Sequence, residues 1–458
     1  MPNYLKRIEA IGIHKRFDIT HDFSPGVNIL HGVNGSGKTT LIHIITNILN
    51  GDYERFLYID FFRIRIWYDD DNFITLLKEN SNDGETQAIN VFVNQDRRGI
   101  KINKQINEFV EESKLELTKR YAQQKVILGV AYFPAFRMMI EAWQSSEENI
   151  SIDQDKTTKF ARKIFGEFTP KINYPSPKDI EQSLIYEIQE IKNKLSVLDR
   201  QVMAQVSIEF ISDSIKNNFQ HNLEKPEIIF SKIKSLFQKI QSYPISEESY
   251  MSSNEIYINI RNLLDLHREN EDRQLTLFLS IYYDSLEKIA TKLKEEYFNI
   301  DKFLSAVNSF LESKKLTIFR GIQKEDNTLI KIIFDDGSIL NGLGLDTLSS
   351  GERQIVTILY AATYMSDEKL IMIDEPEISL HIDWQRNLLK KMSEQLHERQ
   401  VIACTHSPMI PTDYDDYLRE IGITTTDQNL WGLDEEDDDN DNNDFDEYDF
   451  IVDDQEIS

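Results

Sequence analysis

The chain carries, at residues 32–39, the run Gly32-Val33-Asn34-Gly35-Ser36-Gly37-Lys38-Thr39, which fits the phosphate loop pattern G-x-x-x-x-G-K-[ST]. A short apolar run at residues 27–30 precedes it, and the mostly apolar residues 40–45 predict the start of a helix. Strand, glycine loop and helix together bind phosphate through backbone amides and the positive end of the helix. The run therefore predicts a nucleotide site, with Lys38 at the outer phosphates and Thr39 as a ligand of Mg²⁺.

Two further apolar runs end in polar residues suited to the same chemistry. Residues 370–373 predict a buried strand that presents Asp374 at its tip, followed at once by Glu375. We expect Asp374 to hold the hydration shell of Mg²⁺ and Glu375 to orient and polarise an attacking water. Residues 401–405 predict another buried strand with His406 at its tip, where α/β sheets present ligand-binding groups.

In their order along the chain, these motifs resemble the motif set of ABC-type ATPases, and within these the RecF, SMC and OLD-like branch. They lie at residues 34–40, 348–352, 374–376 and 379–381 and at His406. The resemblance implies an α/β fold, the ABC-type ATPase head, which is a P-loop NTPase. It also implies ATP and Mg²⁺ as cofactors, and a dimer in which two heads pack head to tail and share two nucleotide sites.

The resemblance assigns roles within that dimer. Ser349 and Gly351 in the signature of one subunit would close on the γ-phosphate bound to the other. His406 would be the switch histidine that senses this phosphate, so that Glu375 and His406 are the predicted catalytic residues. The loop at residues 379–381 would couple the two sites. The predicted metal ligands are Thr39 and Asp374, and the predicted nucleotide contacts are Asn34, Gly35, Ser36, Gly37, Lys38, Thr39, Thr40, Ser349, Ser350, Gly351 and Arg16.

The match to the family pattern is incomplete at several positions. The signature has Ser350 where Gly is common and Glu352 where Gln is common. Arg16 lies where similar ATPases place a basic residue near the nucleotide, and a solvated hairpin explains it equally well. Residues 132–137 resemble a strand-end segment of OLD-like heads that carries a Pro and an Arg. The glutamine of the family's Q-loop stays open among Gln87, Gln123 and Gln124.

The length is enough for one large domain or two to three ordinary ones, and the composition predicts a cytoplasmic protein. The 458 residues include a single cysteine, Cys404, so neither a disulfide within the chain nor a cysteine metal cluster can form. No apolar run approaches the ~20 residues of a membrane span. Lys6 and Arg7 are not followed by the apolar stretch of a signal peptide. These features argue against a membrane partner and against transport.

Charge is distributed unevenly. Residues 434–458 hold fourteen Asp or Glu and no Lys or Arg, which leaves −13 of the total −27 for the rest of the chain. An acidic body disfavours broad DNA binding. Basic clusters at residues 97–104 and 156–163 are expected to be solvated faces. The acidic tail is expected to be disordered, serving as a solubiliser or as a docking motif.

Changes in composition and hydrophobic pattern divide the chain into four parts. These are an N-terminal lobe of the head at 1–143, a helical insertion at 144–315, a C-terminal lobe at 316–433 and the acidic tail at 434–458. Expected strands cover residues 7–13, 27–30, 56–67, 88–93, 126–133, 316–319 and 329–334. Apolar residues at three- or four-residue spacing predict helices near 180–198, 277–293 and 303–310. Breaks at Pro226 and Pro244 favour several packed helices over the long coiled coil of an SMC arm.

The whole resembles standalone ATPase subunits of bacterial anti-phage systems of the PARIS and Septu type. The resemblance implies a sensor and scaffold in which ATP controls a separate nuclease or toxin subunit. The alternative is a RecF-like, ATP-gated DNA-binding protein of DNA repair. A scaffold without ATPase activity is disfavoured, because Lys38, Asp374 and Glu375 are all present.

Overall fold

The structure is a computed structural model. It describes residues 4–33, 35–68, 72–80, 87–94, 99–103, 129–146, 154–216, 224–243, 255–262, 264, 273–318, 330–340, 344–365, 370–396, 400–410 and 418–426. Asn34, the basic residues 97, 98 and 104, Gln123, Gln124 and the acidic tail lie outside the described residues.

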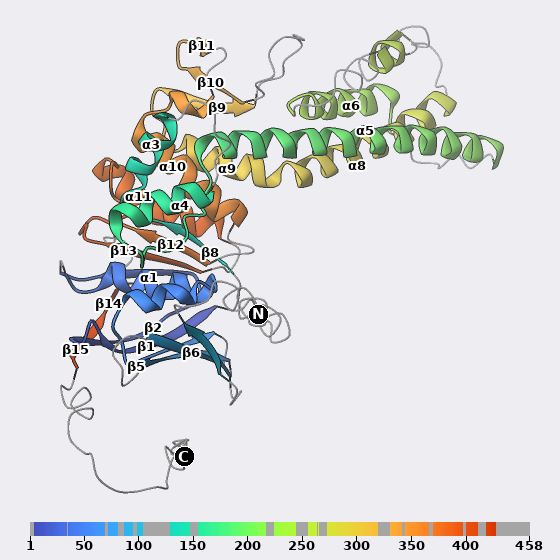
Figure 1. The fold of residues 1–458 in the computed structure, drawn as a ribbon. Helices are drawn as coiled ribbons and strands as arrows, with labels where there is room; N and C mark the ends of the chain where they lie inside the picture. Colours follow the sequence, from blue (N-terminus) through green and yellow to red (C-terminus); the bar gives the residue numbers. More distant parts are fainter. Residues whose placement is uncertain are drawn as a thin grey trace, which may run out of the picture.

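A parallel sheet of five strands stands at the centre of the head (Figure 1). Its order is β14-β3-β13-β12-β8, and neighbouring strands pair in parallel throughout. Strands of such sheets are buried on both faces and so are apolar along their whole length. The sequence follows this rule, since every residue of β8, β12 and β13 is buried. The strands are β3 (Val27–His31), β8 (Val130–Phe133), β12 (Leu370–Asp374), β13 (Val401–Thr405) and β14 (Leu418–Glu420).

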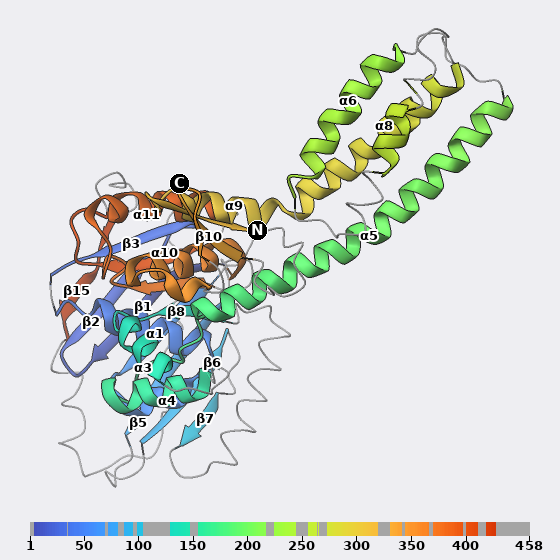
Figure 2. The same ribbon diagram turned by 90° about the horizontal axis from the view of Figure 1, so that it is seen from above.

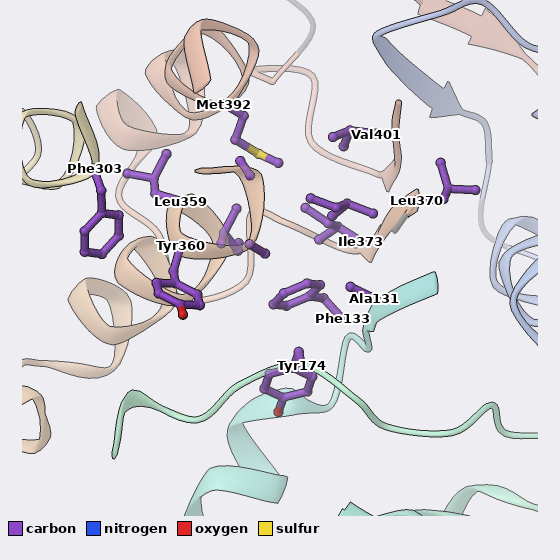
Figure 3. Packing of buried hydrophobic residues seen from close by; sticks show 14 of the residues in the cluster. Ala131, Phe133, Tyr174, Phe303, Leu359, Tyr360, Leu370, Ile373, Met392 and Val401 are labelled. Atoms are coloured by element: carbon purple, nitrogen blue, oxygen red, sulfur yellow. The ribbon is translucent and has the colours of Figure 1, made fainter. Parts of the chain in front are cut away.

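Helices cover the two faces of this sheet. Helix α1 (Lys38–Leu49) contacts β8, β12 and β13. On the other face lie α10 (Ser350–Tyr360), its π-helical continuation η3 (Ala361–Met365) and α11 (Ile382–Gln395). Figure 3 shows the apolar side chains that fill this side of the core, from both the strands and the helices.

A second sheet is antiparallel and has the order β15-β2-β1-β4-β5-β6-β7. Buried and partly exposed residues alternate along β4, as expected for a sheet with one face against the core. The strands are β1 (Leu5–Ile13), β2 (Phe17–Asp22), β4 (Arg63–Tyr68), β5 (Phe73–Asn80), β6 (Gln87–Val93), β7 (Ile100–Asn103) and β15 (Gly422–Thr425).

The predicted strand at residues 56–67 is wrong in its first half. The 3₁₀ helix η1 (Tyr53–Tyr58) occupies that part, and β4 begins only at Arg63. Tyr53 and Phe56 are both buried. Residues three apart face the same side of a 3₁₀ turn, so this turn buries both rings where a strand would place them on opposite faces.

A small antiparallel sheet and several helices complete the head. The sheet has the order β11-β10-β9. Its strands and the remaining short elements are β9 (Lys314–Ile318), β10 (Ile330–Phe334), β11 (Ile339–Leu340), η2 (Leu345–Thr347), α3 (Arg137–Ser146), α4 (Gln154–Phe165) and α9 (Phe298–Asn308).

Helices α5, α6 and α8 form most of an arm that projects from the head (Figure 2). Helix α5 (Pro177–Lys216) has 40 residues and spans about 60 Å at 1.5 Å per residue. Helix α8 (Arg273–Glu296) packs against α5 and against α6 (Pro226–Ile240). Pro226, predicted as a break, starts α6 at a position where proline is compatible with a helix. Among the described helices, none is both long enough and apolar enough to cross a bilayer.

Candidate nucleotide-binding site

The phosphate loop connects β3 to α1. Gly35 and Gly37 have φ angles of 81° and 72°, in the left-handed region that glycine adopts without strain. Helix α1 begins at Lys38, so its N-terminus opens onto the loop. Lys38 is 4% exposed, and its ammonium donates to Gly32 O at 2.7 Å and Val33 O at 3.1 Å. The loop thus wraps around a buried cation, which is the arrangement that a phosphate site requires.

Thr39 and Asp374 meet across the sheet edge. The Thr39 hydroxyl donates to Asp374 Oδ2 at 3.0 Å. Burial raises the pKa of Asp374 to about 6, although the Thr39 hydrogen bond and Arg137 act in the opposite direction. A hydroxyl and a carboxylate side by side fit Mg²⁺, which takes one or two protein oxygens and completes its shell with water and phosphate. In the described part of the chain, no cluster of three or more His, Cys, Asp or Glu could hold a metal by itself.

Glu375 and His406 lie beside Lys38. His406 Nε2 is 3.2 Å from Glu375 Oε1, and His406 Nδ1 is 3.3 Å from Lys38 Nζ. Burial and then the Glu377 carboxyl raise the pKa of Glu375 to about 8. Burial and then the Lys38 charge lower the pKa of His406. Both shifts favour the neutral forms of Glu375 and His406 where the two side chains meet.

Arg137 is a site residue that the predicted set lacks. It is 2% exposed, and its guanidinium donates to the backbone oxygens of Asp374 at 3.0 Å, Glu375 at 2.8 Å and Pro134 at 3.0 Å. These bonds hold the backbone that carries both acidic residues, where Glu375 adopts a φ of 51°. The resemblance of residues 132–137 to a family segment was the available signal, but it did not indicate what Arg137 contacts.

The signature residues begin helix α10. Ser349 is the N-cap, and it forms a capping box with Glu352: Glu352 N donates to Ser349 Oγ, and Ser349 N donates to Glu352 Oε2 at 2.7 Å. Glu352 also pairs with Lys314 at 2.9 Å. The departure from the usual Gln thus has a structural explanation in this chain, because Glu352 both caps the helix and forms an ion pair.

Gly351 brings α10 close to the loop at residues 379–381. A Cβ atom at Gly351 would lie 2.6 Å from Ser379 O, so only glycine fits without a backbone shift. One turn later, Gln354 Nε2 donates to Pro376 O at 2.9 Å. The signature helix is therefore attached, within one subunit, to the segment that follows Glu375.

The remaining predicted residues lie at varied distances from this centre. Thr40 is in the first turn of α1. Arg16 is exposed in the turn between β1 and β2, and its neighbour Phe17 packs over Gly37, so this turn lies beside the phosphate loop. Gln87 starts β6, which β1, β4 and β5 separate from β2.

A comparison with known protein families identifies the family of this chain. The AAA ATPase domain family matches residues 14–410, which include the phosphate loop, the signature, Asp374, Glu375 and His406. The chain belongs to the AAA ATPase domain family. Its α/β P-loop fold with a helical insertion and its ATP-binding character follow from this membership. An AAA ATPase domain of this kind is consistent with the contacts of Lys38 and Thr39 described above.

Individual relatives are distant. The Retron Ec83 probable ATPase of Escherichia coli is 24% identical over 178 residues, which cover 36% of this chain and 30% of that protein. The chain thus aligns with less than a third of this relative's length.

One similar structure is the SMC head domain of Pyrococcus furiosus bound to the C-terminal domain of ScpA. The alignment covers 95% of this chain and 99% of that chain, with a TM-score of 0.36 and 12% sequence identity. An SMC head bound to the C-winged helix domain of ScpA covers 92% and 98%, with a TM-score of 0.39 and 11% identity. Likeness at these scores does not bear on function.

Proposed function

We propose that this AAA ATPase domain hydrolyses ATP at the edge of its parallel sheet. The observation that carries the proposal is the convergence of Lys38, Thr39, Asp374, Glu375 and His406 at the carboxyl ends of β3, β12 and β13, which are neighbours in the sheet. Ligands of open α/β sheets bind at this end of the strands.

Each residue has a role that its present contacts support. Lys38 would exchange its loop carbonyls for phosphate oxygens, and Thr39 and Asp374 would hold Mg²⁺. When bound, Mg²⁺ would supply positive charge that neutralises the charge developing on the phosphate. Glu375 would accept a proton from the attacking water. Burial and the Glu377 carboxyl raise the pKa of Glu375, which makes its carboxylate a stronger proton acceptor.

We further propose that two copies form composite sites head to tail. Ser349 is exposed at the start of α10, and its hydroxyl oxygen accepts the Glu352 N–H. The hydroxyl hydrogen of Ser349 can therefore donate to a phosphate bound to the partner subunit. The first turn of α10 also presents backbone amides and the positive end of the helix to that phosphate.

Mixing two inactive variants tests the composite site. Lys38→Ala removes the phosphate cation, and Ser349→Arg places a bulky cation where the partner's phosphate would approach. In a mixed dimer, one site carries both changes and the other joins an intact phosphate loop to an intact signature. Recovery of ATP turnover on mixing supports action across the dimer. If heterodimers are shown to form but hydrolyse no ATP, this result would count against two sites that work independently.

For the biological role, we propose a sensor and scaffold that controls a separate nuclease in anti-phage defence. The aligned relative is named as part of a retron, which supports a role as one component of a larger system. Within the insertion predicted at 144–315, between head lobes predicted at 1–143 and 316–433, the arm of α5, α6 and α8 would supply the platform for the partner. Co-purification from the native host tests this: an ATP-sensitive complex with a nuclease supports it, and stable binding to DNA alone would favour the repair alternative.

A further inference from the structure

Glu377 makes contacts that the roles above do not use. It follows Asp374 by three residues, in the turn between β12 and α11. Its Oε1 accepts three hydrogen bonds: from Thr405 Oγ1 at 2.7 Å, from His406 N at 2.9 Å and from Ser407 N at 2.8 Å. Its Oε2 is also buried. One carboxylate oxygen thus accepts from three donors at the end of β13.

The position of the His406 ring depends on this segment. Strand β13 ends at Thr405, so the N–H groups of His406 and Ser407 lie beyond the sheet pairing. Glu377 accepts the hydrogen bonds of these two N–H groups, which no strand among the described residues accepts. The ring then stands between Lys38 Nζ and Glu375 Oε1, at 3.3 Å and 3.2 Å. A backbone shift of one ångström away from either partner would lengthen that ring contact beyond hydrogen-bond range.

We propose that Glu377 is a positioning residue for ATP hydrolysis: its carboxylate fixes the backbone of residues 405–407 and thereby holds His406 between Lys38 and Glu375. This inference rests on the proposed function and adds a residue to it. Glu377 acts through the backbone of His406, and its carboxyl also adjoins Glu375, whose pKa is raised by burial and then by this carboxyl.

Two substitutions of Glu377 separate the effect of its side-chain length from the effect of its charge. Glu377→Gln keeps the side-chain length, so its amide oxygen can still accept the three donors, but it removes the charge. Glu377→Asp keeps the charge but is shorter by one carbon–carbon bond, about 1.5 Å, so it cannot reach all three. A positioning role requires reach, whereas a role as base or counter-ion requires charge.

Steady-state ATP turnover by the full chain is measured for both variants and for Glu377→Ala. We expect Asp and Ala to lower kcat by ~10–100-fold, since a misplacement of about one ångström can cost ~10². The KM for ATP should stay within about threefold, because the phosphate loop is untouched. Glu377→Gln should lower kcat by no more than about threefold, because it keeps the reach to the three donors and removes only a charge that adds to the effect of burial in raising the pKa of Glu375. Glu394→Ala is the matched control, since Glu394 is a partly exposed acid on α11 that pairs with Lys391 at 2.9 Å.

A double-mutant cycle adds a result that a merely structural role would not produce. In a His406→Ala background, Glu377→Asp should cost little further kcat, because the ring that it misplaces is gone. A kcat order in which Asp exceeds Gln would overturn the proposal and assign the charge a direct role. So would a wild-type kcat for Asp, or full additivity with His406→Ala. If the Glu377→Ala variant does not fold, the comparison of Glu377→Asp with Glu377→Gln still tests the proposal. Wild-type protein without turnover would instead overturn the proposed function, and this inference with it.

Discussion

A partly exposed histidine in α1, close to the phosphate loop, makes the stability of the fold depend on pH. His43 lies in α1, five residues after Lys38, and its Nε2 is 2.8 Å from the hydroxyl of Tyr132 in β8. Its ring meets that of Tyr132 edge-on, with centroids 5.5 Å apart. Burial lowers the pKa of His43 from 6.5 to about 3. The contact that joins α1 to β8 therefore uses the neutral ring.

The sign and size of the effect follow from this pKa. Above pH 6.5, His43 is neutral in both folded and unfolded chains, and it contributes no pH dependence. Below pH 6.5, the unfolded chain takes up a proton that the folded chain does not, so folded stability falls as pH falls toward 3. At pH 5.5, one unit below the unfolded pKa, the loss from this group is about 1.4 kcal/mol.

Urea unfolding of the wild type and of His43→Gln, each at pH 7.5 and pH 5.5, isolates this loss. Glutamine does not titrate and keeps an amide within reach of the Tyr132 hydroxyl, while the other histidines titrate equally in both proteins. The free energy of unfolding of the wild type should fall by about 1.4 kcal/mol more than that of the variant. Equal losses in the two proteins would refute the burial argument.

Three further changes test other parts of the account. Lys38→Ala should abolish ATP binding in a nucleotide titration, because the phosphates lose their fixed cation; retained affinity would contradict the phosphate-loop assignment. Gly351→Ala should lower turnover and destabilise the head by ~1–3 kcal/mol, since its Cβ would lie 2.6 Å from Ser379 O, and normal turnover and stability would show that this contact is loose. Deleting residues 434–458 should leave melting temperature and basal turnover nearly unchanged, whereas a large drop in melting temperature would show that the tail packs on the body.

Local motifs made much of the site predictable. The phosphate loop, Asp374 and His406 each directly follow an apolar run that forms a parallel strand, so sequence order alone indicated that they would share one sheet edge. The long apolar face near residues 180–198 likewise predicted α5, because its spacing matches the helical period.

Other features depend on tertiary pairing and left no local pattern. Arg137 bonds to backbone oxygens that become its neighbours only when β8 pairs with β12, where Phe133 lies opposite Ile373. Glu377 reaches backbone amides that the pairing of β12 with β13 brings near. Backbone groups are the same at every residue, so sequence cannot mark them as partners. The 3₁₀ turn η1 was missed for a related reason, since its apolar residues also suit a strand.

Phosphate release by Glu375→Gln tests the central claim most directly. The substitution keeps the shape of the side chain and removes its capacity to accept a proton, while Lys38 and Thr39 stay in place. ATP binding should persist in a nucleotide titration, and the rate of phosphate release should fall by ~10²–10⁴ relative to the wild type, the usual contribution of a positioned base. Release at the wild-type rate, or a wild type that releases no phosphate, would contradict the assignment of this site as an ATPase that uses Glu375.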